Sequence, residues 1–96
     1  MPTIVRLHYG NYRLHFWSNE GNPSEPVHIH VTKSKPSGND TKFWLMSDGT
    51  VALAKLTDSI NSKDVEKLKK DIKCNFDIIY EAYMWTHSNS SGLKEV

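Results

Sequence analysis

Apolar and polar residues alternate with a period of two in the first part of the chain, which is typical of half-buried strands. Two such runs, 3–9 and 12–18, are joined by Gly10-Asn11, where glycine suits the positive φ of a two-residue hairpin turn. This pattern predicts a β-hairpin with one apolar face. The cross-strand pairs expected on that face are Tyr9 with Tyr12, Leu7 with Leu14 and Val5 with Phe16.

Further strand-like runs follow along the chain. Asp48-Gly49 lies between the last two of them and is a strong hairpin signal, whereas 18–26 and 33–40 are rich in turn formers and predict loops. The last run, VALAKL, suits either a strand or a helix. We therefore expect an antiparallel sheet of four to five strands. The further runs are 27–32, 41–46 and 51–56.

The period of the apolar residues changes to that of a helix after residue 60. Asn61 or Ser62 can cap its start. The pattern predicts one long C-terminal helix over about 62–86, packed on the sheet, so that the fold class is α+β, and it leaves open a bend near Cys74-Asn75. We expect one domain over 1–87 and a flexible tail over 88–96. The helical stripe consists of Val65, Leu68, Ile72, Phe76, Ile79 and Tyr83.

A second apolar strip lies on the back of the predicted helix, formed by Cys74, Ile78 and Trp85. One interpretation is that loops of the same molecule bury this strip. The other is a surface for self-association or for a partner, because exposed Trp and Ile together are unusual. The sequence leaves both interpretations open.

Charge and cysteine content limit the classes of function. The formal net charge is +1 over 96 residues, which gives only weak support for nucleic-acid binding. No apolar stretch has the length of a membrane span, and the start MPTIVRLHYG lacks the apolar run of a signal peptide. Cys74 is the only cysteine, which suits a reducing compartment. We expect a cytoplasmic protein.

The His-x-His motif at His28 and His30 is the most specific local feature. Alternate strand residues project from the same face, so two imidazoles can share a metal such as zinc or act as acid and base. If the strands share one core face, His8 and His15 emerge beside them. Arg6 and Arg13 would lie there too, as candidates for anion binding. The alternative is a plain polar, solvent-facing side of the sheet.

Several motifs resemble, in the same order, those of the domain of unknown function 4160 family. They are MPTIV, FWSNE, PVHIHV, TKFWL and a helix ending in IIYEAY, where the family has PPHVHV, KFWL and a Trp at the position of Tyr83. The resemblance covers about 1–86. It implies a small bacterial α+β protein, encoded alone or beside another small protein in a toxin–antitoxin-like pair. It transfers no catalytic residues.

Two functions remain open. The first is a binding or regulatory module, one half of a two-gene pair, for which small size, balanced charge and the resemblance argue. The second is a small histidine-dependent nuclease or metal-assisted hydrolase that uses His28 and His30 with His15 and His8. The two differ in whether the histidines converge on one accessible site.

Overall fold

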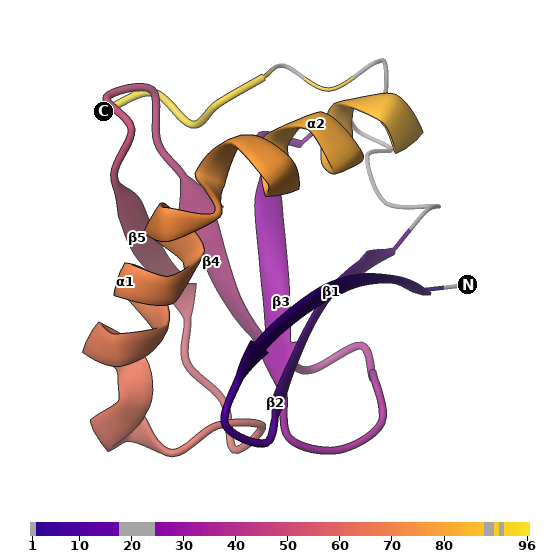
Figure 1. Cartoon of the computed structure of the whole chain (residues 1–96), viewed down its shortest axis with the longest axis vertical. Coiled ribbons are helices and arrows are strands. Elements are labelled where there is room, and N and C mark those ends of the chain that lie inside the picture. Colours follow the sequence, from indigo (N-terminus) through magenta and orange to yellow (C-terminus); the bar gives the residue numbers. More distant parts are fainter. Residues whose placement is uncertain (1, 18–24, 88–89, 91) are drawn as a thin grey trace.

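The computed structural model describes residues 2–17, 25–87, 90 and 92–96, and of 2–9 it describes the backbone. Within this part of the chain, five strands form one antiparallel sheet in the order β1-β2-β3-β4-β5 (Figure 1). Helices follow the last strand in the sequence. The strands are β1 (Pro2–Tyr9), β2 (Tyr12–Trp17), β3 (His28–Thr32), β4 (Thr41–Leu45) and β5 (Val51–Lys55). The helical elements are η1 (Ser62–Asp64), α1 (Val65–Cys74) and α2 (Phe76–Thr86).

The predicted α+β class and the antiparallel sheet are confirmed. Both hairpin turns lie where the sequence predicts them, with Gly10 at φ 58° and Gly49 at φ 85°. These left-handed conformations are strained for residues with a side chain, which explains glycine at both turns. The run 51–56, for which a helix was the alternative, forms β5 and pairs with β4.

The first hairpin contains a register shift that the sequence pattern does not predict. The shift lies between Val5 and His8 in β1, so the ladder does not continue in the simple register from the turn. The expected pairs Leu7 with Leu14 and Val5 with Phe16 are therefore wrong. Alternation alone gives no sign of extra residues in one strand. The observed pairs are Tyr9 with Tyr12, as predicted, Val5 with Leu14, and Thr3 with Phe16.

The predicted single helix over 62–86 is divided in two at Asn75, which has φ −113°. The Asn75 amide donates to the Ile72 carbonyl at 3.1 Å, and its side-chain Nδ2 donates to the Asp71 carbonyl at 2.9 Å. An asparagine that binds the preceding turn in this way competes with continued α-helix. Figure 1 shows α2 running at an angle to α1. Neither helix of the described residues is long and apolar enough to cross a membrane.

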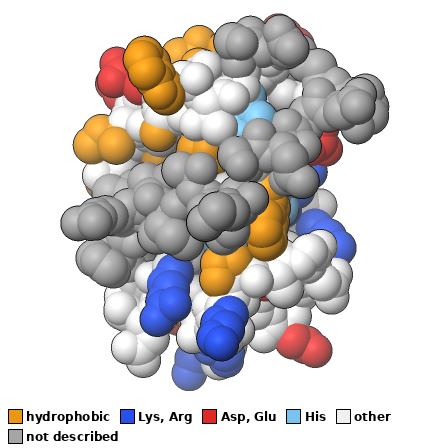
Figure 2. Space-filling model, turned by 90° about the vertical axis from the view of Figure 1, so that its right-hand side faces the viewer, with side chains coloured by type: hydrophobic (Ala, Val, Ile, Leu, Met, Phe, Trp, Pro, Cys, Tyr) orange, Lys and Arg blue, Asp and Glu red, His pale blue; other side chains and the backbone are white. Residues whose placement is uncertain are grey.

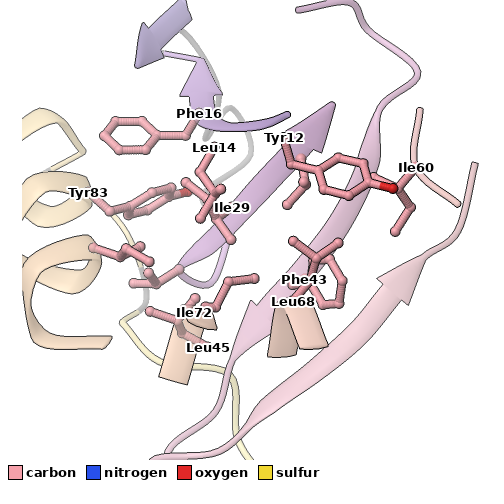
Figure 3. Close-up of a cluster of buried hydrophobic side chains, with 13 residues drawn as sticks. Tyr12, Leu14, Phe16, Ile29, Phe43, Leu45, Ile60, Leu68, Ile72 and Tyr83 are labelled. Carbon is pink, nitrogen blue, oxygen red and sulfur yellow. The ribbon is translucent and has the colours of Figure 1, made fainter. Parts of the chain in front are cut away.

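The core lies between one face of the sheet and the two helices (Figure 3). Ile29 of β3 and Phe43 of β4 are fully buried in it, as the alternation predicts. From the helices, Ile72 and Tyr83 enter the same cluster. The main buried residues are Leu14, Phe16, Val27, Ile29, Val31, Phe43, Leu45, Leu68, Ile72, Ile79 and Tyr83.

Hydrogen bonds attach the start of the helical segment and part of the predicted tail to the sheet. The Tyr12 hydroxyl donates to Asp64 Oδ2 at 2.7 Å and accepts from the Asn61 amide at 3.0 Å, which holds the helix start predicted at Asn61. Part of the predicted tail lies against the sheet: the Lys94 amide donates to the Leu45 carbonyl at 2.9 Å. Residues 88, 89 and 91 of that tail lie outside the described residues.

We expect Asp71→Asn to stabilise the protein at neutral pH. Burial raises the pKa of the Asp71 carboxyl, its Oδ2 has no hydrogen-bond partner among the described residues, and it lies near the negative end of α1. The pKa of Asp71 is higher in the folded than in the unfolded protein. The contribution of Asp71 to stability is therefore most favourable at low pH, where the carboxyl is protonated, and it is lost as the pH rises through the folded pKa.

The expected gain for Asp71→Asn is about 0.5 kcal/mol near pH 7 and close to zero near pH 3, below the ordinary pKa of aspartate. Thermal unfolding at both pH values measures it. The exposed Asp58 provides the matched control, Asp58→Asn, which should change little at either pH. A loss of stability in Asp71→Asn at neutral pH would contradict the argument.

Candidate functional site

Three of the candidate histidines lie together in the fold. His15 of β2 is the register partner of His30 of β3, and their rings stack with centroids 5.4 Å apart. His28 lies two residues along β3, with its ring 5.1 Å from that of His30. We call these residues the histidine cluster. Their positions on neighbouring strands agree with the shared face that the alternation predicts.

The histidine cluster is buried, whereas the sequence pattern predicted that these side chains form either an accessible site or a plain solvent-facing side of the sheet. His15 and His28 have an exposed fraction of 0%, and His30 has 8%. Aromatic rings surround them: Trp17 lies 5.9 Å from His15, and Trp44 lies 5.7 Å from His28 (ring centroids). These three rings therefore lie neither on a solvent-exposed polar face nor in an open site.

His28 reaches the helical layer as well. Its ring centroid lies 5.3 Å from that of Tyr83 in α2, and the Tyr83 hydroxyl lies 3.4 Å from Nδ1. The same Nδ1 lies 3.0 Å from the Pro26 carbonyl. A carbonyl oxygen can only accept, so the hydrogen-bond network assigns the proton of His28 to Nδ1. These contacts fix the orientation of the His28 ring at the start of β3.

Asp40 places a carboxylate beside the histidine cluster. Its Oδ2 lies 3.2 Å from His15 Nε2, and both side chains are almost fully buried. Ser37 supports the carboxylate, since its amide donates to Oδ2 at 2.8 Å and its hydroxyl donates to Oδ1 at 3.0 Å. A carboxylate that touches an imidazole can fix the orientation of the ring. The contact between Asp40 and His15 connects the end of the 33–40 loop to β2.

The predicted metal and anion sites remain untested. Among the described side chains, no group of three histidine, cysteine, aspartate or glutamate residues has the geometry to hold a metal ion, so zinc at His28 and His30 stays a prediction. Arg13 is exposed on β2. His8 is its backbone register partner, but the side chains of His8 and Arg6 lie outside the described part of the structure.

Lysines flank the indole of Trp44 on the same side of the sheet. Lys42 Nζ lies 4.4 Å and Lys94 Nζ 5.4 Å from the ring centroid, both within cation–π range. Lys42 also forms an ion pair with Glu25 at 3.2 Å. Trp44 is half-buried in this position.

Three residues of this region were missed as members of the site: Asp40, Tyr83 and His87. His87 follows α2, its ring stacks on Tyr83 with centroids 4.2 Å apart, and its Nε2 donates to the Trp17 carbonyl at 2.7 Å. It thereby ties α2 to the end of β2. Only Asp40 carries a local signal, since Ser-Gly-Asn-Asp is a sequence that forms side-chain-bonded turns.

The second apolar strip of the helix is exposed, so its burial by loops of the same molecule is ruled out for these side chains. Trp85 has an exposed fraction of 91% and Ile78 of 57%, and Cys74 is exposed too. Ile78, Glu81 and Trp85 fall within a sector of about 60° on α2. We call these three residues the outer face of α2. Ile78 and Trp85 belong to the apolar strip for which the sequence left a partner surface open.

The comparison with protein families agrees with the motifs in the sequence. The family model described as Domain of unknown function (DUF4160) matches residues 11–84, which spans β2 to α2. No curated protein and no solved structure matches the chain significantly. The matched range includes the histidine cluster and Tyr83. The chain therefore belongs to the DUF4160 family, a family of domains of unknown function.

Proposed function

We propose that this chain is a binding module that recognises a protein partner through the outer face of α2. The observation that supports this proposal is the 91% exposure of Trp85. Tryptophan is the residue most enriched among interface hot spots, and its exposure in water brings no benefit to the isolated fold. Ile78, 57% exposed and two turns away on the same side, extends the apolar surface.

The rest of α2 supports a binding role because the inner side of the helix packs against the core. Ile79 and Tyr83, on the inner side, are fully buried in the core. His87 then fastens the helix end to β2 through the Trp17 carbonyl at 2.7 Å. A rigid helix loses little conformational entropy when a partner binds it, so its exposed side chains are ready to contribute affinity.

The alternative, a histidine-dependent nuclease or hydrolase, has weaker support. A catalytic imidazole must come within hydrogen-bond distance of the substrate, and the rings of His15 and His28 are fully buried. His28 Nδ1 is engaged by the Pro26 carbonyl at 3.0 Å. The contact of His15 with Asp40 at 3.2 Å resembles an acid–base pair, but both side chains are almost fully buried, out of reach of a substrate.

The resemblance to the family supplies a first partner to test, the small protein encoded by an adjacent gene, in a toxin–antitoxin-like pair. The two proteins would be expressed together, and the complex would be measured by size-exclusion chromatography and by titration calorimetry. We expect a complex with the wild-type chain and a loss of affinity of about 30-fold or more in Trp85→Ala.

Leu56→Ala serves as the control, because Leu56 is also an exposed apolar residue, at 46%, but follows β5 instead of lying on α2. Trp85→Ala should leave the thermal stability of the isolated chain nearly unchanged. No complex with the neighbouring protein, or a complex that Trp85→Ala and Ile78→Ala both leave intact, would count against the proposal. RNA degradation by the wild type that is lost in His30→Gln would favour the enzyme instead.

A further inference from the structure

The charges on α2 restrict the chemistry of its partner. Over Phe76–Thr86 the helix carries Asp77 and Glu81 and has no Lys or Arg. Both acids are exposed, and within the described residues neither forms an ion pair. Glu81 lies between Ile78 and Trp85 on the outer face, three residues after the first and four before the second.

Other parts of the molecule carry the opposite charge. The preceding helix α1 has four lysines against two acids, and the whole chain has a net charge of +1. In Figure 2, most of the Lys and Arg side chains lie in the lower half of the view, and acidic side chains lie both beside hydrophobic ones at the upper end, where Figure 1 places α2, and at the right and lower edges. The negative character of α2 is therefore local.

We infer that the outer face of α2 binds a segment of another protein that is both apolar and basic, with Lys or Arg beside its apolar residues. This inference rests on the proposed function and adds the chemistry of the partner to it. Leucine-like side chains of the segment cover Ile78 and Trp85. Its cations pair with Glu81 and Asp77, which lie at the rim of that contact.

A second copy of this chain fits the surface less well. Apposing two α2 helices through a two-fold axis would bring Glu81 and Asp77 of one copy against those of the other. Like charges placed opposite one another at an interface oppose binding. A basic segment meets no such repulsion, so charge complementarity selects a different protein as the occupant.

Two amphipathic peptides of about 14 residues, long enough to cover the length of α2, test this inference. Both carry the same leucines, and one has Lys where the other has Glu. Titration calorimetry at low salt should show that the Lys peptide binds the full chain about tenfold more tightly than the Glu peptide, and that salt reduces this preference. Trp85→Ala should weaken the binding of the Lys peptide.

Glu81→Lys should remove most of the preference. Asp58→Lys changes the net charge equally but lies after β5, so it should keep the preference. Equal binding of both peptides, still lost in Trp85→Ala, overturns the charge selection and leaves the proposed function standing. Binding of neither peptide, or binding that ignores Trp85, also overturns the inference. So does self-association of the chain that sedimentation detects and Trp85→Ala abolishes.

Discussion

Replacing Tyr83 by alanine is expected to lower the free energy of unfolding by about 3–5 kcal/mol. Tyr83 is fully buried and belongs to α2, yet its ring contacts two different strands. The ring centroids of Phe16 in β2 and His28 in β3 each lie 5.3 Å away, and His87 stacks on its other side at 4.2 Å. Truncation would leave a large cavity between helix and sheet.

The companion variant Tyr83→Phe separates the ring from the hydroxyl. It keeps the aromatic packing and removes the hydroxyl, which lies 3.4 Å from His28 Nδ1, so we expect a loss of about 1 kcal/mol. Urea denaturation followed by far-UV circular dichroism measures both variants. If Tyr83→Ala lost no more stability than Tyr83→Phe, the packing role assigned to the ring would be wrong.

Asp40→Ala is expected to destabilise the protein by about 2–3 kcal/mol. The carboxylate accepts from the Ser37 amide at 2.8 Å and from the Ser37 hydroxyl at 3.0 Å, and it lies 3.2 Å from His15 Nε2. Alanine would remove the turn contacts of Ser37, which is exposed, and would take the carboxylate away from the fully buried ring of His15. Desolvated donors that lose their partner cost more than the mean value of a hydrogen bond.

Asp58→Ala is the matched control for Asp40→Ala, because Asp58 is exposed and removing it changes the net charge equally. Asp40→Asn should fall between the two, since an amide oxygen can still accept from Ser37. Chemical denaturation gives the free energies, and the imidazole proton shifts of His15 report on the contact directly. A loss in Asp40→Ala as small as in Asp58→Ala would show that the buried pair contributes nothing.

Much of the sheet was predictable because alternation is a property of adjacent residues. Ile29 and Phe43 are buried as the period of two requires, and Gly10 and Gly49 mark turns whose backbone favours glycine. The shift between Val5 and His8 was not predictable, since extra residues in one strand leave no trace in the alternation. The sequence left a bend near Cys74-Asn75 open but did not predict that the helix divides there, because the apolar stripe continues across it.

The candidate site was predictable only in part. Strand alternation predicts that His15, His28 and His30 share one face, whereas the pairing of His15 with His30 comes from the register of β2 and β3, which the sequence does not give. Burial of those rings does not follow from the sequence either, because it depends on segments distant in the sequence: His28, for example, contacts Tyr83, 55 residues away. The strip of Ile78 and Trp85 was recognised in the sequence, but its exposure depends on which segments the fold leaves beside it.

By itself the sequence determined the α+β class, the order of its elements and the family to which the chain belongs. These properties rest on local periodicity and on short motifs, which neighbouring residues specify. Only the tertiary structure decided that the histidines are enclosed while Trp85 faces water. Burial is set by contacts between distant segments, and no local pattern records whether another segment covers the back of a helix or the second face of a sheet.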